Sequence, residues 1–174
     1  MTEQLKLLVI GLGNPLLGDD GVGWRVVEFV EQKLHDKSHP FVSSWIEFEY
    51  LSLGGLSLME RMEGYKSVIV VDSILTGTKP IGTIYSLPLS NLPNLSAGHT
   101  TAVHDTSLAT ALEVGKRMGM VLPKEVWVVA VEAEQVFHFS ENLSPEIEDA
   151  VPIAADIVIE LLENREANEK ILFP

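Results

Sequence analysis

The fold class is decided by residues 5–23, LKLLVIGLGNPLLGDDGVG. The first part, 5–11, is a short continuous apolar run that ends in glycine, which is typical of a strand buried in a sheet. From Gly21 to Leu34 the apolar residues recur at helical spacing, so a helix should follow the glycine-rich turn directly. A buried strand that passes through such a turn into a helix indicates an α/β protein.

Strand-like and helix-like segments alternate along the rest of the chain. We expect strands at 46–51, 67–73, 83–89 and 124–132, and helices at 56–62, 105–118 and from 145 to about 162, with Ser144 as the last N-cap. Pro88 cannot donate to a ladder, so its strand should lie at an edge, and the helix-free stretch 81–100 favours a hairpin. The prediction is a three-layer α/β fold, with a twisted, mostly parallel but mixed sheet of about five strands and helices on both faces.

Length and composition predict a single α/β domain over residues 1–174, with a charged tail at 164–174 that is able to fray. The N-terminus does not resemble a secretory signal, and no apolar run is long enough for membrane insertion. The sequence has no cysteine, which excludes disulfides, thiol nucleophiles and cysteine zinc sites and makes the cytoplasm the expected location.

The chain is strongly acidic, with 25 Asp and Glu against 12 Lys and Arg and a formal net charge of −13. Such a charge argues against a nucleic-acid partner, because a phosphate backbone would be repelled. The segment from Glu125 to Glu169 is especially rich in acids, opposed only by Arg165 within it and by Lys170 directly after it. Solubility and a basic partner protein are both compatible with this pattern.

The glycine-rich turn does not match a phosphate-binding loop. Gly11 and Gly13 fit the start of a dinucleotide fingerprint, but Leu16 stands where its third glycine belongs, and no G-K-[ST] sequence is present. Asp19 and Asp20 would also place negative charge where a pyrophosphate should bind.

Carboxylates stand at the start of the first expected helix and at the end of the strand expected at 67–73. One of the adjacent acids Asp19 and Asp20 is enough to cap the following helix, so we interpret Asp19 as the cap and Asp20 as the acid available for chemistry. Asp72 closes the apolar run 68–71 and should lie near the exit of the first strand, unless it simply emerges into solvent.

Histidines flank the segment that leads into the helix expected at 105–118. His104 directly precedes Asp105, a candidate N-cap, and His99 lies five positions earlier. A histidine in this place can be a metal ligand or a hydrogen-bonding loop residue. The other three histidines, His35, His39 and His138, have no comparable context.

Two carboxylates and an imidazole from three segments match a facial metal site with open positions. Such a metal would act as a Lewis acid, and the ligand types suit nickel, zinc, manganese or iron. A serine nucleophile is less consistent with the sequence, because G-x-S-x-G is absent.

Three blocks, GLGNPLLGDDGVG, SVIVVDS and HDTSLATAL, resemble in order and spacing those of the [NiFe]-hydrogenase maturation endopeptidases. The resemblance extends from Leu5 to about Leu162. It implies that Asp20, Asp72 and His104 are the metal-binding and catalytic residues. His99 is a candidate extra ligand, or a residue that supports a ligand by hydrogen bonding. The glycines of the first block would allow tight turning and close approach of the substrate tail; they are Gly11, Gly13, Gly18, Gly21 and Gly23.

The resemblance also implies an activity and a partner. These endopeptidases remove a C-terminal peptide from the precursor of the hydrogenase large subunit once nickel is in place. The nickel is then supplied by the substrate, although another divalent metal could bind the isolated protein. Several members carry an Asp-Gly-Gly-Thr-like turn after the second strand, whereas this chain has Tyr50-Leu51-Ser52-Leu53.

Two other functions remain open from the sequence. The same three ligands would serve a non-catalytic metal-sensing chaperone for hydrogenase assembly. GLGNP after a first strand also resembles peptidyl-tRNA hydrolases, but their Thr-Arg-His-Asn block is missing and the net charge opposes tRNA binding.

Overall fold

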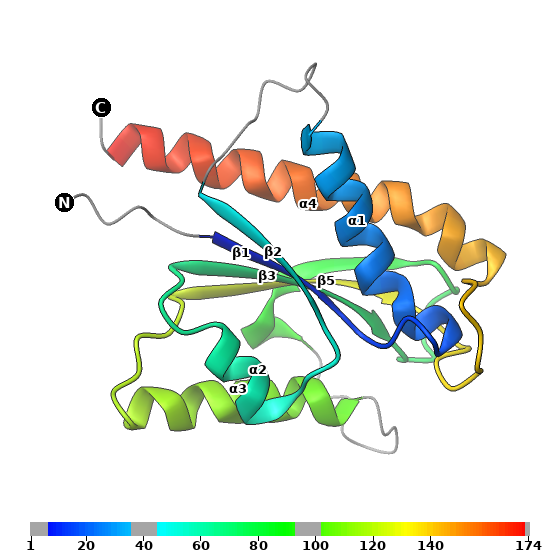
Figure 1. Cartoon of the computed structure of the whole chain (residues 1–174), viewed down its shortest axis with the longest axis horizontal. Helices are drawn as coiled ribbons and strands as arrows, with labels where there is room; N and C mark the ends of the chain where they lie inside the picture. Colours follow the sequence, from blue (N-terminus) through cyan, green and yellow to red (C-terminus); the bar gives the residue numbers. More distant parts are fainter. Residues whose placement is uncertain (1–6, 36–44, 93–101, 173–174) are drawn as a thin grey trace.

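The computed structural model describes residues 7–35, 45–92 and 102–172, and describes side chains throughout these ranges except at 102–107 and 166–172. The strands are β1 (Leu7–Leu12), β2 (Ile46–Leu51), β3 (Ser67–Ile74), β4 (Ile84–Pro88) and β5 (Glu125–Glu132). The α-helices are α1 (Val22–His35), α2 (Gly55–Arg61), α3 (Ala102–Arg117) and α4 (Pro145–Leu172), and the short 3-10 helices are η1 (Gly18–Gly21) and η2 (Leu89–Asn91). Figure 1 shows their arrangement.

The strands form one mixed sheet in the order β2-β1-β3-β5-β4. β1 pairs in parallel with β2 and β3, and β3 pairs in parallel with β5. β4 lies at the edge, antiparallel to β5, with Tyr85 opposite Ala130. The mostly parallel sheet and the edge position of the Pro88 strand are confirmed. The hairpin expected within 81–100 is wrong, because β3 is already paired on both sides and β4 joins β5 across a connection that contains α3.

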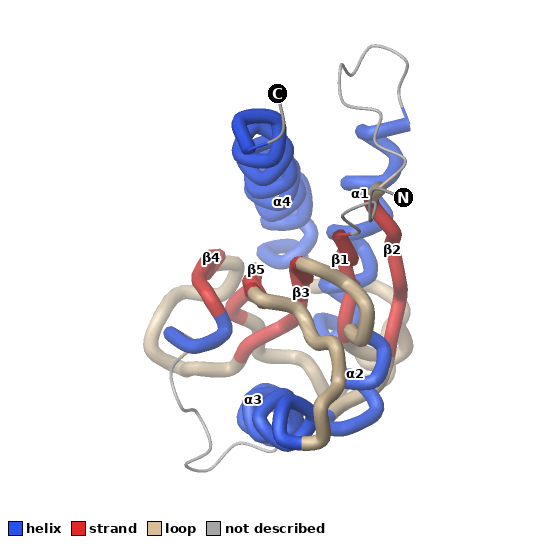
Figure 2. The backbone as a smooth tube through the Cα atoms, turned by 90° about the vertical axis from the view of Figure 1, so that its left-hand side faces the viewer, coloured by secondary structure: helices blue, strands red, loops and turns tan. Residues whose placement is uncertain are grey.

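Helices cover both faces of the sheet, as predicted. α1 and α4 pack on one face, and α2 and α3 pack on the other (Figure 2). All six residues of β1 are buried, and successive side chains alternate between the two layers. Leu7 and Val9 join the core under α1 and α4, whereas Leu8 and Ile10 join the core under α2 and α3.

Two helix ends differ from the sequence-based expectation. α3 begins at Ala102, so His104 and Asp105 lie in its first turn and Asp105 is not the N-cap. Ala102 is the strongest helix-forming residue type, which favours this earlier start. α4 begins at Pro145 behind Ser144, as predicted, but continues to Leu172 beyond the end expected near 162.

No helix in the described part of the chain is both long enough and apolar enough to span a membrane.

Candidate functional site

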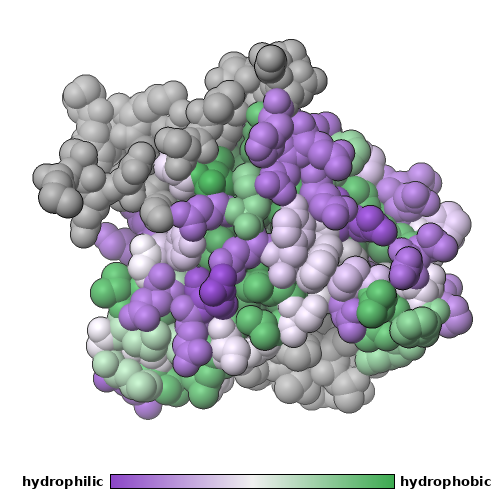
Figure 3. All heavy atoms as spheres, in the orientation of Figure 1, coloured by the Kyte–Doolittle hydropathy of each residue, from purple (hydrophilic) through white to green (hydrophobic). Residues whose placement is uncertain are grey.

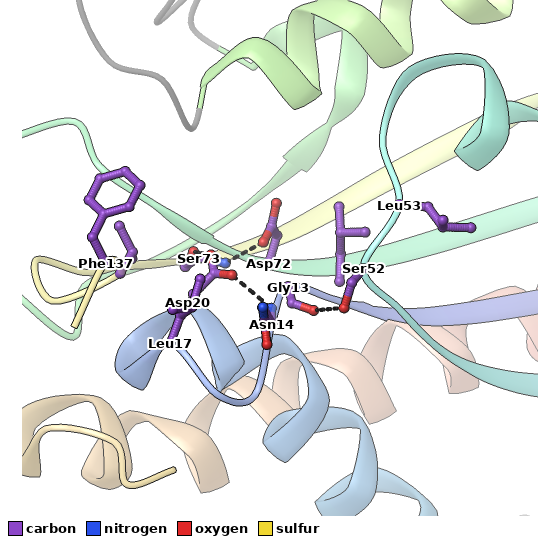
Figure 4. A pocket seen from close by; sticks show the side chains of 11 residues that line it. Gly13, Asn14, Leu17, Asp20, Ser52, Leu53, Asp72, Ser73 and Phe137 are labelled. Carbon is purple, nitrogen blue, oxygen red and sulfur yellow. Dashed lines mark hydrogen bonds between the residues drawn. The ribbon is translucent and has the colours of Figure 1, made fainter. Parts of the chain in front are cut away.

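A cavity of about 270 Å³ lies where β1 and β3 end and η1 begins. Its floor and walls come from segments far apart in the sequence (Figure 4). The lining residues are Leu12, Gly13, Asn14, Leu17, Asp20, Ser52, Leu53, Asp72, Ser73, Val136 and Phe137. This is the edge of the sheet at which ligands bind in open α/β folds.

Asp20 and Asp72, two of the predicted site residues, both line this cavity. Asp20 Oδ2 accepts a hydrogen bond from the backbone N–H of Asn14 at 2.7 Å, and its Oδ1 accepts one from the hydroxyl of Ser73 at 3.2 Å. Asp72 Oδ1 accepts the backbone N–H of Ser73 at 2.8 Å. Ser73 therefore links the two half-buried carboxylates, which reach the same cavity from η1 and β3.

The third predicted residue, His104, is only partly described. Its backbone lies in the first turn of α3, and Figure 1 shows the amino end of α3 at the same end of the molecule as the carboxyl ends of β1 and β3. Its side chain is not among those described, and His99 and His39 lie outside the described residues altogether. The ligand role of His104 and the supporting role of His99 therefore stay predictions.

Across the described side chains, no group of three His, Cys, Asp or Glu residues is arranged to hold a metal ion. His35 Nδ1 lies 2.7 Å from the carbonyl of Glu31 at the far end of α1, and His138 is exposed. The donor set that the cavity itself provides is therefore the carboxylate pair of Asp20 and Asp72. Carboxylate oxygens suit a divalent cation that still has open coordination positions.

Asp19 is a structural acid, but it does not cap its own helix as predicted. It is only 1% exposed, and η1 has no side-chain cap. Its Oδ1 accepts the backbone N–H of Ser144 at 2.7 Å, and its Oδ2 accepts the Ser144 hydroxyl at 3.1 Å and the Gln135 N–H at 3.3 Å. Asp19 thus anchors the segment between β5 and α4 to the first block.

We expect Asp19→Asn to lower the free energy of unfolding by about 2–4 kcal/mol. An amide accepts through one oxygen, and its NH₂ group would face N–H donors that now bind a carboxylate. Urea titration followed by circular dichroism measures this change. The matched variant Asp149→Asn, on the exposed surface of α4, should change stability by less than about 0.5 kcal/mol. Equal stability of both variants would show that the Asp19 contacts contribute little.

The glycines of the first block bring backbone segments together. A Cβ on Gly23 would lie 2.3 Å from the carbonyl oxygen of Leu12 and 2.4 Å from that of Val71, so α1 can pack this closely on β1 and β3 only with glycine there. Gly13 has a φ of 126°, and its Cβ would lie 1.9 Å from the carbonyl oxygen of Asp20. A Cβ added to any of the remaining three glycines would likewise collide with backbone atoms of the same chain; these are Gly11, Gly18 and Gly21. These glycines thus allow close approach within the protein's own backbone, and the close approach of a substrate tail stays a prediction.

Glu132 is a buried acid that the sequence analysis missed. Burial alone raises its pKa, but hydrogen bonds from Thr76, Tyr85 and the backbone N–H groups of Gly77 and Thr76 outweigh that effect, so its pKa is lowered from the usual value. These contacts hold the loop that follows β3, the strand that carries Asp72. The signal was present in the sequence, because Glu132 ends an apolar run as Asp72 does.

Asn14, Ser52, Ser73 and Phe137 also line the cavity without having been predicted. Asn14 lies within the first sequence block and Ser73 ends the second, and their hydrogen bonds position Asp20. Ser52 donates its hydroxyl to the carbonyl of Gly13 at 2.7 Å, which ties the end of β2 to the first turn. Phe137 lies in a loop whose sequence carries no recognisable motif.

A family model described as hydrogenase maturation protease, HycI, matches residues 52–161, more than half of the chain. This chain belongs to the hydrogenase maturation protease family. The matched region contains Asp72 and the position of His104, whereas Asp20 precedes it.

Comparison with other proteins agrees with this membership. The chain is 27% identical to the hydrogenase 2 maturation protease of Escherichia coli, over 91% of each chain. The hydrogenase maturating endopeptidase HybD from E. coli has a solved structure with a TM-score of 0.75 and 27% identity, covering 92% of this chain and 93% of that one. A hydrogenase 2 maturation peptidase from a thaumarchaeote is 30% identical, with a TM-score of 0.62 over 90% of this chain and 97% of that one.

The family and the α/β fold expected from the sequence are therefore confirmed. As a member of the hydrogenase maturation protease family, the protein is an enzyme that hydrolyses peptide bonds. The match to the hydrogenase maturation protease family disfavours a peptidyl-tRNA hydrolase, which the GLGNP sequence also resembles.

Proposed function

We propose that this hydrogenase maturation protease removes the C-terminal peptide from the large-subunit precursor of a [NiFe] hydrogenase after nickel has been inserted. One observation carries the proposal. Asp20 and Asp72, separated by more than fifty residues in the sequence, lie on one cavity at the carboxyl ends of β1 and β3 and are linked through Ser73. The relatives' names, which refer to hydrogenase maturation, support the choice of substrate.

The nickel in this proposal belongs to the substrate. Asp20 and Asp72 offer hard oxygen ligands at the cavity, and His104 at the amino end of α3 would add an imidazole. The substrate's nickel would act as a Lewis acid and hold the scissile peptide in a fixed geometry. The protein itself then needs no serine or cysteine nucleophile.

The residues of this chain orient the substrate. Asp20 is held by the N–H of Asn14 and the hydroxyl of Ser73, so its carboxylate is positioned before the substrate arrives. A prepositioned carboxylate loses little freedom on binding and lowers the cost of bringing the scissile carbonyl and the attacking water together. We place the reaction in the cytoplasm, as expected from the sequence, with no nucleic acid involved.

The proposal is tested by intact-mass spectrometry of a nickel-loaded large-subunit precursor encoded in the same genome. After incubation with this protein, the precursor should lose the mass of a C-terminal peptide, and a sample without the protein should keep its full mass. A precursor mass that stays unchanged while the two proteins form a complex would overturn the proposal in favour of a metal-sensing chaperone.

A further inference from the structure

The cavity is lined by apolar side chains as well as by the two carboxylates. Leu17, Leu53 and Phe137 line it together with Asp20 and Asp72. Figure 4 shows Phe137 and Leu53 on opposite sides, with the two carboxylates between them. Phe137 is 67% exposed, although the preceding residue, Val136, is only 1% exposed. In Figure 3, hydrophobic groups reach the surface among hydrophilic ones at this end of the molecule.

The loop that carries Phe137 is fixed on both sides of this residue. On one side, Asp19 accepts the N–H of Gln135. On the other side, Ser140 accepts the N–H of Gly18 at 2.7 Å and donates its own N–H to the carbonyl of Leu16 at 3.0 Å. An aromatic ring presented to solvent by an anchored backbone is already in place for a ligand, which reduces the ordering cost of binding.

The absence of a side chain on Gly18 permits this contact. A Cβ there would lie 2.8 Å from the carbonyl oxygen of Gln135 and 3.3 Å from that of His138, so any larger residue would push the loop away. The first block therefore determines the position of Phe137 as well as that of Asp20.

The charges of the cavity restrict what can bind beside Phe137. Asp20 and Asp72 would repel an acidic side chain, and the chain as a whole carries a net charge of −13. Phe137 and Leu17 offer apolar contact to a large uncharged side chain. The carboxylates and Phe137 lie in one cavity. A single extended substrate segment could therefore place its bound metal ion at the carboxylates and an apolar side chain against Phe137.

We propose that Phe137 and Leu17, on one side of the two carboxylates, form a subsite that receives one large apolar side chain of the substrate's C-terminal segment, next to the scissile bond. This subsite rests on the proposed peptidase function and adds a sequence preference to it. It selects precursors with a large apolar residue at one position near the cleavage point and rejects those with an acid there.

A pair of phenylalanines in one loop allows a matched test. Phe139 is 78% exposed but does not line the cavity, whereas Phe137 does. With a nickel-loaded precursor as substrate, Phe137→Ser should raise KM by about 10- to 100-fold, with kcat changed by less than about threefold, since the interaction contributes to binding. Phe139→Ser should leave both constants unchanged. Equal kinetics of Phe137→Ser and the unaltered protein, or equal losses in both variants, would overturn the subsite.

A double-mutant cycle identifies the partner residue. Each apolar residue that flanks the mapped cleavage point is changed to Ser in the precursor. At one position the change should raise KM for the unaltered protein as much as Phe137→Ser does, with little further loss when the two changes are combined. Additive losses at every position would contradict a direct contact, and would assign the apolar surface to another occupant such as a second copy of this chain.

The Asp20→Asn variant separates the two proposals. If this variant cleaves normally, the proposed function fails as well. If it is inactive while Phe137→Ser matches the unaltered protein, only the subsite is wrong. Because Phe137 is exposed, Phe137→Ser should keep its unfolding temperature, so a kinetic loss cannot be attributed to unfolding.

Discussion

Replacing Asp20 by Asn is expected to stop trimming of the nickel-loaded precursor while the fold survives. The substitution keeps the shape of the side chain but removes its charge and one acceptor oxygen. Because interactions that stabilise charge at a reacting centre are worth several kcal/mol, the cleavage rate should fall on the order of 10²–10³-fold or more. Intact-mass spectrometry over a time course measures this rate.

The environment of Asp20 explains why the fold should tolerate this change. Asp20 is half-buried, and an amide oxygen can still accept the N–H of Asn14. Asp72→Asn should give a similar loss of cleavage, whereas Asp149→Asn on α4 should cleave normally. Loss of the circular dichroism signal in the Asp20 and Asp72 variants would instead make both residues structural, and normal trimming would remove them from the active site.

The second large effect concerns the metal state of the substrate. If Asp20, Asp72 and His104 contact nickel in the precursor, a nickel-free precursor should remain uncut under conditions in which the loaded form is fully trimmed. The reason is that the carboxylates would then face no cation, and the scissile bond would not be held in place. Parallel incubations analysed by intact mass provide the comparison.

A control separates nickel in the substrate from nickel bound by the protease. The protease is incubated with nickel, passed through a desalting column and added to nickel-free precursor, which should still remain uncut. Equal trimming of loaded and nickel-free precursors would refute recognition of the substrate's nickel. Trimming only by the nickel-treated protease would mean that the protease itself holds the metal.

The segment at the end of β2 borders the cavity that contains Asp20 and Asp72. The sequence Tyr50-Leu51-Ser52-Leu53 departs from the Asp-Gly-Gly-Thr-like turn of several family members. Ser52 and Leu53 line the cavity, and Ser52 donates a hydrogen bond to Gly13. This departure therefore changes the wall of the substrate cavity, and Leu53 makes that wall apolar on the side opposite Phe137.

Most of the secondary structure could be predicted because local patterns determine it. The run at 67–73 became β3, the segment at 46–51 became β2, and Ser144 precedes α4 as expected. The proximity of Asp20 and Asp72 was also predictable, because the carboxyl ends of neighbouring parallel strands lie at the same edge of a sheet. The start of α3 was less predictable, since helix starts depend on weak differences in propensity.

The sequence by itself determined the order of strands and helices, the glycine-rich turn and the pair of carboxylates at the strand ends. Tertiary structure alone decided that β4 pairs with β5, that Asp19 binds Gln135 and Ser144 across 116 and 125 positions, and that Phe137 faces the cavity. The physical reason is the sequence separation over which each kind of interaction acts. Periodicity and turn chemistry act between near neighbours in the chain, whereas these contacts form only after the sheet and its helices have brought distant segments together.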